Sequence, residues 1–279
     1  GYKHCEFVAH RSFKLKLNPQ AVVIRFCGHQ HLSLGRVEVA QQNVIQWEAE
    51  KCSAEIRVKS HAGQIMTPLY RLQNPYPLNI PGIEIASATP ELFLSRSGSA
   101  IKTSPIKGTI RENETAFGEK DKAENLMIVD LMRNDLGRIC KPGTVDVSEL
   151  FRQEKHPGLV HLVSDVAGEL NENTTWEQIL SATTPPGSVS GAPKSAALSM
   201  IGEIEGARGP YCGALGWING SEALLSVAIR TFWKIGDDTL RFGTGAGITW
   251  GSDPELEWEE TQLKARRLIS IAGGALSDS

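Results

Sequence analysis

The last third of the chain constrains the fold most, because candidate strands and a helix follow one another there with clear turns between them. Three segments are predicted to be strands, separated by Asn219-Gly220 and Gly236-Asp237-Asp238: 211–218, 223–235 and 239–249. A helix is predicted over 254–272, with Asp253 or Ser252 as its N-cap and Gly273-Gly274 at its end. An antiparallel meander of three strands before a helix favours an α+β fold, in which strands and helices do not alternate regularly.

The middle of the chain contains further recognisable elements. Strands are predicted over 83–88, 91–95 and 159–164, and helices over 119–139, 176–182 and 192–204. The first 70 residues carry no motif. Candidate strands there are 21–27 and 36–40, and 44–58 could be either strand or helix.

Composition excludes several classes of protein. The 279 residues carry a net charge of −3, which excludes a broad basic surface, so no nucleic-acid partner is expected. The five cysteines are scattered without a CxxC pair, which favours reduced thiols and a cytoplasmic location. No apolar run is long enough to span a membrane, and the N-terminus lacks the layout of a signal peptide.

The predicted final helix carries Glu257, Glu260 and Lys264 on one face, since they are spaced i, i+3 and i+7. One interpretation is a solvated face with helical salt bridges, and the other is a set of carboxylates for a metal ion. The predicted buried stripe consists of Leu256, Leu263 and Leu268.

A second helix offers the same pattern. Asp121 and Glu124, also spaced i, i+3, precede the apolar run 126–129. Two helices with paired carboxylates could together supply the oxygen ligands that Mg²⁺ prefers. Spacing alone does not show that the two helices meet.

Two glycine-rich loops are candidate anion sites. Residues 243–247 could present backbone N–H groups to a carboxylate, or could be a glycine-rich strand end. Residues 187–194 lead into a helix N-terminus, which favours anions, but lack the spacing of a nucleotide-binding loop.

Three single residues are unusual for their surroundings. Lys107 lies in the tight loop Pro105–Thr109, where its amine could determine which reaction the site catalyses. His161 lies in an apolar strand and could be a core histidine or an acid–base group. Arg230 lies within a predicted apolar strand, so it requires an anionic partner from the protein or a ligand.

Together these residues resemble the chorismate-binding enzyme family, which includes anthranilate synthase component I, aminodeoxychorismate synthase component I and the isochorismate and salicylate synthases. The matching blocks, in the family's order, are SATPELF (87–93), PIKGT (105–109), ENLMIVDLMRNDLGR (124–138), HLVS (161–164), GSVSGAPK (187–194), RGPYCGALG (208–216), AIRT (228–231), GAGI (245–248) and SDPELEWEETQLK (252–264). The resemblance implies an α+β fold like that of anthranilate synthase component I, with antiparallel sheets packed face to face and surrounded by helices.

Within the family, the lysine of PIKGT resembles aminodeoxychorismate synthase component I, because anthranilate and isochorismate synthases typically have alanine there. This implies amination of chorismate at carbon 4, with ammonia from a separate glutamine amidotransferase, giving 4-amino-4-deoxychorismate for p-aminobenzoate and folate. The alternatives are an anthranilate or isochorismate synthase-type enzyme, or a truncated, non-catalytic homologue.

The resemblance also implies roles for individual residues. Lys107 would be the nucleophile, and Glu91 and His161 would lie near the leaving group. Mg²⁺ would be held by Glu124 and Glu260, with Asp121 and Glu257 supporting. The implied substrate-binding residues are Gly108, Thr109, Ser188, Tyr211, Arg230, Gly245, Ala246, Gly247 and Lys264.

The N-terminal part departs from the sequence pattern of the family. A segment of the form I-x-x-G-D-x-x-Q-x-x-L is expected before Asn74-Pro75-Tyr76-Pro77, and only Ala62-Gly63-Gln64-Ile65 is found. We therefore expect a divergent or incomplete part over 1–70 and a chorismate-binding catalytic domain over 71–279.

Overall fold

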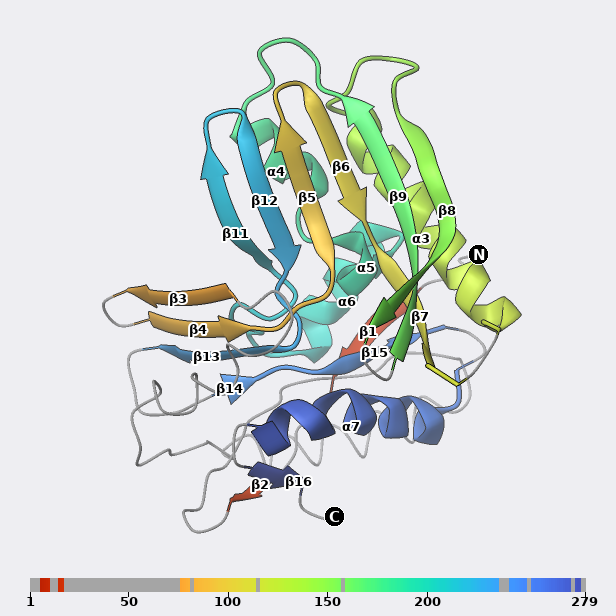
Figure 1. The fold of residues 1–279 in the computed structure, drawn as a ribbon, viewed down its shortest axis with the longest axis vertical. Coiled ribbons are helices and arrows are strands. Elements are labelled where there is room, and N and C mark those ends of the chain that lie inside the picture. Colours follow the sequence, from red (N-terminus) through yellow and green to blue (C-terminus); the bar gives the residue numbers. More distant parts are fainter. Residues whose placement is uncertain are drawn as a thin grey trace. The chain divides into compact units, whose positions relative to one another are not determined.

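The computed structural model describes residues 83–113, 116–156, 159–235, 241–249 and 252–271, with four further short strands. The chain divides into two compact units (Figure 1). Unit 1 comprises 1–90, 195–212 and 228–279, and unit 2 comprises 91–194 and 213–227. The predicted elements 21–27, 36–40 and 44–58 lie outside the described residues. Within 1–70 only the strands β1 (Glu6–His10) and β2 (Leu15–Leu17) are described.

Unit 2 is built on a seven-stranded sheet in the order β11-β12-β5-β6-β9-β7, with β8 also pairing with β9. The strands are β5 (Leu92–Ser97), β6 (Ala100–Ser104), β7 (Ile106–Arg111), β8 (Asp146–His156), β9 (Leu159–Glu169), β11 (Ala214–Asn219) and β12 (Glu222–Val227). All the pairings are antiparallel. β6 and β7 pair with successive parts of β9, which therefore has three partner strands, β6, β7 and β8.

Helix α3 (Glu119–Gly137) packs against β7 and β9 of this sheet. Its buried residues are Asn125, Ile128, Val129, Met132, Asp135 and Leu136, a stripe at helical spacing. The short helices α4 (Trp176–Thr183) and α5 (Gly187–Ser190) also contact α3. A side chain at Gly187 would meet Leu131 Cδ2 at 2.3 Å, so only glycine allows α5 to approach α3 this closely.

Unit 1 contains a four-stranded antiparallel sheet in the order β14-β13-β4-β3. Its strands are β3 (Tyr76–Ile80), β4 (Ile83–Ser87), β13 (Thr231–Ile235) and β14 (Arg241–Phe242). Phe232 and Phe242 stack across β13 and β14 with ring centroids 4.5 Å apart. Two further pairs join β15 (Gly245–Ile248) to β1 and β16 (Gly274–Leu276) to β2.

Two helices complete the description of the chain. Helix α6 (Lys194–Ile204) follows β10 (Gly191–Ala192), and helix α7 (Pro254–Ile271) contacts β15 and β16. Asp253 is the N-cap of α7, because its Oδ1 accepts hydrogen bonds from the backbone N–H groups of Glu255 and Leu256.

The predicted α+β fold is confirmed, but the predicted three-strand meander is wrong. The segment 223–235 is two strands, β12 and β13, which join different sheets. The chain changes direction between them at Arg230, whose φ of 50° is incompatible with a continuing strand. The segment 239–249 also divides, because β14 pairs with β13 whereas β15 pairs with β1.

The predicted apolar stripe of the last helix is wrong at two positions. Leu256 and Leu263 are 64% and 56% exposed, and only Leu268 is buried. The buried face instead carries Glu257, Thr261, Ala265, Leu268 and Ile269. This face is displaced by one residue from the predicted one, which is a rotation of about 100° around the helix.

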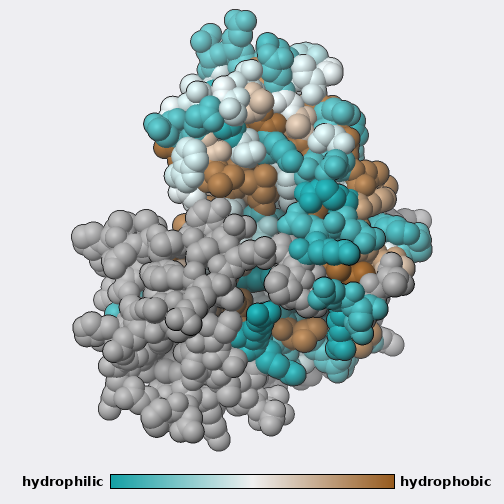
Figure 2. All heavy atoms as spheres, viewed as in Figure 1, coloured by the Kyte–Doolittle hydropathy of each residue, from teal (hydrophilic) through white to brown (hydrophobic). Residues whose placement is uncertain are grey.

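Figure 2 shows the surface of the described residues as a mosaic of hydrophilic and hydrophobic patches on the face in view. Such a mixture is ordinary for a folded domain. Among the described residues, no helix combines the length and the apolar character that crossing a membrane requires.

Candidate active site

In unit 2, the predicted nucleophile lies at a bulge in β7. The register of β7 with β9 shifts between Ile106 and Thr109, so Lys107 and Gly108 form the irregular part of the strand. Lys107 is 9% exposed. Gly108 has φ 88°, in the region that favours glycine.

Gly108 also allows β7 to approach the first turns of α3. A side chain there would meet Asp121 Cβ at 2.9 Å and Phe117 Cδ1 at 3.1 Å. The Asp121 carboxylate in turn accepts a hydrogen bond of 3.0 Å from the backbone N–H of Gly118, the N-cap residue of the helix. The bulge with Lys107 and the carboxylate turn of α3 are therefore neighbours.

His161 on β9 faces Thr109 on β7. The two residues are register partners, and Thr109 Oγ1 lies 2.9 Å from His161 Nδ1. His161 is 1% exposed. It is thus a buried histidine with a polar partner, an arrangement compatible with both interpretations made from the sequence.

Glu91 precedes β5 in the same unit and is 4% exposed. Its Oε1 lies 3.5 Å from the backbone N–H of Ile106, directly before Lys107. Unit 2 therefore brings Glu91, the Lys107 bulge and Thr109–His161 to one region of the sheet.

Glu124, one turn after Asp121 on α3, has a side chain that is 13% exposed. Its Oε1 lies 3.7 Å from Lys120 Nζ. The carboxylate already lies near one cation, so its charge and partial access to solvent are compatible with a metal ligand.

Ser188 lies on α5 and is 6% exposed. Lys194, at the end of the same loop, donates to Asp135 Oδ2 of α3 at 2.5 Å and to the carbonyl of Thr183 at 3.1 Å. The lysine of the predicted anion loop is thus engaged in a buried ion pair with α3.

In unit 1, three of the predicted residues lie together on α7 and β15. Lys264 Nζ lies 2.8 Å from Glu260 Oε1 and donates to the carbonyl of Gly245 at 3.4 Å. Gly245, Ala246 and Gly247 pair with β1, so this glycine-rich segment is a strand rather than an open loop.

Glu257 is buried, unlike Glu260, although the sequence assigned both to one polar face. Glu257 is 4% exposed and accepts a hydrogen bond of 2.6 Å from Ser252 Oγ. The side chain of Glu260 is 46% exposed. The ion pair of Glu260 with Lys264 confirms the helical salt bridge of the first interpretation and leaves a metal role as a prediction.

Tyr211 is buried and packs closely against Gly243. A side chain at Gly243 would meet the Tyr211 ring at 2.3 Å, so the two segments are in close contact. Burial raises the pKa of the Tyr211 phenol well above its ordinary value, which keeps it protonated. Nearby, Arg208 makes two contacts of 2.6 Å with the carboxylate of Glu205.

Arg230 lies in the break between β12 and β13, and not in a strand as predicted. Its carbonyl accepts a hydrogen bond of 3.1 Å from the backbone N–H of Ala88. Its side chain is half-buried.

The predicted site residues therefore form two groups. Unit 2 holds Glu91, Lys107, Gly108, Thr109, Asp121, Glu124, His161 and Ser188, and unit 1 holds Tyr211, Arg230, Gly245, Ala246, Gly247, Glu257, Glu260 and Lys264. Within the described residues, no three acidic, histidine or cysteine side chains are grouped closely enough to bind a metal ion. The donors on α3 and α7 are carboxylate oxygens, which suit Mg²⁺, but these helices belong to different units.

Sequence reasoning missed the buried polar contacts behind these residues. Three such contacts are the hydrogen bond between Asn125 on α3 and Ser164 on β9, the ion pair Glu205–Arg208 and the ion pair Asp135–Lys194. Asn125 stands beside Glu124, but nothing in the local pattern indicates its partners.

Comparison with known proteins gives consistent matches. The family model described as chorismate binding enzyme matches residues 69–270. Anthranilate synthase component 1 from Saccharolobus solfataricus is 42% identical over 68% of this chain and 48% of its own length. A homologue with the same description from Haloarcula marismortui is 34% identical over 86% of this chain and 53% of its own.

Solved structures agree with the sequence matches. Anthranilate synthase component I from Streptococcus pneumoniae superposes with a TM-score of 0.70 at 28% identity, covering 89% of this chain and 61% of that one. The menaquinone-specific isochorismate synthase from Escherichia coli gives 0.71 at 21% identity, covering 94% and 64%, and supports the fold. The chain spans about half the length of the curated relatives it matches. With the family model covering most of its residues, this chain belongs to the chorismate-binding enzyme family.

Proposed function

We propose that this chain is the chorismate-binding part of an enzyme that converts chorismate, of the type represented by anthranilate and isochorismate synthases. The observation that carries the proposal is the arrangement in unit 2. A buried lysine at a strand bulge lies beside a Thr109–His161 pair, and Asp121 of α3 packs against the same bulge. Family membership supplies the substrate class.

The finer proposal is amination at carbon 4 of chorismate, and it rests on Lys107. As a neutral amine, Lys107 attacks carbon 2 and the 4-hydroxyl leaves with a proton as water. Ammonia then adds at carbon 4, the Lys107–carbon 2 bond breaks, and the lysine returns to its starting state. Chorismate and ammonia thus give 4-amino-4-deoxychorismate and water. A covalent step of this kind divides one difficult displacement into two easier ones.

Residues around the bulge have supporting roles in this proposal. His161 donates the proton that the departing hydroxyl takes up, and Glu91 supports this proton transfer. Thr109 Oγ1, 2.9 Å from His161 Nδ1, fixes the orientation of the ring. Tyr211, Arg230 and Lys264 hold the carboxylates of the substrate. The family's motifs assign Gly108, Ser188 and the backbone of Gly245, Ala246 and Gly247 to substrate binding as well.

Mg²⁺ is part of the proposal. Glu124 and Glu260 would hold it, with Asp121 and Glu257 supporting. When bound, it supplies positive charge to the ring carboxylate and polarises the conjugated system. The partner proposed to supply ammonia is a glutamine amidotransferase subunit.

An anthranilate synthase-type reaction is the second candidate, and the names of the relatives favour it. It predicts anthranilate and pyruvate as the products. Isochorismate would indicate that water, not ammonia, attacks the ring.

A product assay by mass spectrometry separates these candidates. The purified protein is incubated with chorismate, Mg²⁺ and ammonium, with and without EDTA. Aminodeoxychorismate that disappears with EDTA supports the finer proposal, and anthranilate supports the second candidate. Unchanged chorismate contradicts both and favours a non-catalytic homologue.

The variant Lys107→Ala tests whether Lys107 determines which product is formed. We expect aminodeoxychorismate to fall by at least about a hundredfold, because the nucleophile is lost. The matched control is Lys102→Ala, on neighbouring β6, where the side chain is 40% exposed and paired with Asp165. Full aminodeoxychorismate output from Lys107→Ala would contradict the covalent step.

A further inference from the structure

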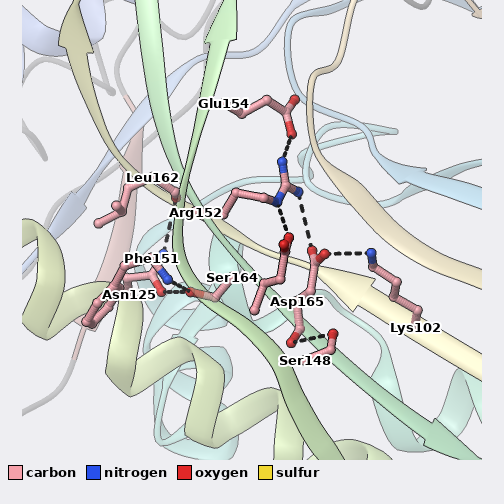
Figure 3. Close-up of polar contacts among 10 residues, drawn as sticks. Lys102, Asn125, Ser148, Phe151, Arg152, Glu154, Leu162, Ser164 and Asp165 are labelled. Carbon is pink, nitrogen blue, oxygen red and sulfur yellow. Dashed lines mark hydrogen bonds and ion pairs between the residues drawn. The ribbon is translucent and has the colours of Figure 1, made fainter.

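A buried polar network joins α3 to β9 in unit 2, one residue away from Glu124 (Figure 3). Asn125 Nδ2 donates to the carbonyl of Leu162 at 3.2 Å, and Asn125 Oδ1 accepts from Ser164 Oγ at 2.5 Å. Asn125 and Ser164 are both 0% exposed. Both ends of the amide are therefore used, which fixes the rotation and height of α3 against β9.

The network continues into β8 through an unusual backbone conformation. The backbone N–H of Phe151 donates to Ser164 Oγ at 3.0 Å. Phe151 has φ 59°, rare for an aromatic residue, and the register of β8 with β9 shifts between Glu149 and Arg152. This bulge directs the Phe151 N–H to Ser164 in place of a regular strand bond.

The side chain of Phe151 is part of an apolar cluster next to the start of α3. It packs with Ile110 against the buried cluster of Phe117, Val160 and Leu162. Phe117 lies directly before α3 and also faces Gly108. A strained backbone that persists in this position is held there by the surrounding contacts.

We infer that Asn125, Ser164 and the Phe151 bulge are positioning residues that set the carboxylates of Asp121 and Glu124 relative to Lys107 and His161. The reason is geometric. Glu124 precedes Asn125, and Asp121 is one turn earlier, beside Gly108. His161 precedes Leu162, whose carbonyl is bound by Asn125. One amide thus links the helix that carries the carboxylates to the strand that carries the histidine.

This inference rests on the proposed function for its kinetic test. The variant is Ser164→Ala, which removes the hydroxyl shared by Asn125 and Phe151 and changes little volume. The matched control is Ser148→Ala, since Ser148 also joins β8 to β9, through a contact of 3.5 Å with the carbonyl of Asp165 (Figure 3).

In Ser164→Ala we expect the Mg²⁺ concentration for half-maximal activity to rise about tenfold or more, and kcat to fall similarly, as for other residues that orient metal ligands. KM for chorismate should change less than about threefold, because the groups proposed to hold the substrate carboxylates are untouched. Ser148→Ala should stay within about twofold of the wild type in all three quantities. An unchanged Mg²⁺ dependence in a folded Ser164→Ala protein would overturn the inference.

A second measurement does not depend on turnover. Amide hydrogen exchange over 119–129 reports how firmly the first turns of α3 are held. We expect exchange there to accelerate about tenfold or more in Ser164→Ala and to match wild type in Ser148→Ala. If the wild type converts no chorismate, the proposed function fails and this measurement still tests the positioning. Equal exchange in the two variants would contradict it.

Discussion

The two faces of β9 are held to their neighbours by different chemistry. On the α3 face, Asn125 and Ser164 form a neutral network that is 0% exposed. On the other face, the buried Asp165 carboxylate lies 2.6 Å from Lys102 and 3.5 Å from Arg152. Side chains alternate along a strand, so adjacent residues Ser164 and Asp165 serve opposite faces.

The difference shows where loss of one partner is tolerated. The partners of Asp165 have side chains that are 40% and 32% exposed, so water can replace a lost contact. Water cannot reach the Asn125 network without local opening, so an orphaned group there bears the full desolvation cost. The side of β9 with weaker individual interactions is therefore the more sensitive one.

Asn125→Ala should give the largest effect, because it removes the acceptor of the Ser164 hydroxyl and the side-chain donor to the Leu162 carbonyl, and it creates a cavity. We expect a loss of about 3 kcal/mol in unfolding free energy, measured by urea denaturation. A loss below about 1 kcal/mol would mean that water enters this face and that the contrast is wrong.

Gly108→Ala tests a second contact on the α3 side. The added Cβ would stand 2.9 Å from Asp121 Cβ, and alanine disfavours φ 88°. We expect the unfolding free energy to fall by about 2 kcal/mol. We also expect kcat to fall by more than the increase in unfolded protein explains. Gly98→Ala is a suitable control, since φ is 61° there but nothing lies within 4 Å of the added Cβ.

Asp165→Asn should cost only about 1 kcal/mol at neutral pH. Burial alone would raise the pKa of Asp165, but hydrogen bonds from Lys102 and Ser104 and the charge of Arg152 hold it below the ordinary 3.8. A lowered pKa means that the ionised form stabilises the fold above pH 3.8 and that this contribution disappears as pH falls further. The stability difference between wild type and Asp165→Asn should therefore shrink on acidification. A constant difference down to about pH 2 would contradict this.

Lys102→Ala should have the smallest effect, about 0.5 kcal/mol, because its side chain is largely solvated and Arg152 remains beside Asp165. We expect this cost to diminish further in 1 M salt, where exposed charges are screened. Thermal melts at low and high salt measure it. A salt-independent cost would show that the charged face is as dry as the other.

The sequence predicted the elements whose signals are local. The helix predicted over 119–139 is α3, Glu119–Gly137, and the N-cap of α7 is Asp253, one of the two predicted residues. These succeed because periodicity, capping residues and turn glycines act within a few residues.

The failures depend on contacts between distant parts of the chain. Neither the break at Arg230 nor the bulge at Phe151 carries a glycine or proline, so nothing local indicates the positive φ. The backbone of each residue instead bonds to a distant part of the chain, Arg230 to Ala88 and Phe151 to Ser164. The buried face of α7 contains the polar residues Glu257 and Thr261, so the apolar stripe in the sequence predicts the wrong face of the helix as buried. The family's motifs predict candidate site residues, but they do not indicate the network behind Asn125.

The interleaved path of the chain has a consequence for its synthesis. Strand β5, near residue 92, pairs with β12, which ends at residue 227. While the ribosome makes the intervening residues, one edge of β5 has no native partner and is open to pairing with other chains. We expect the nascent protein to need a chaperone over this interval. The hairpin of β11 and β12, although short, is then the part whose arrival covers the open edge of β5.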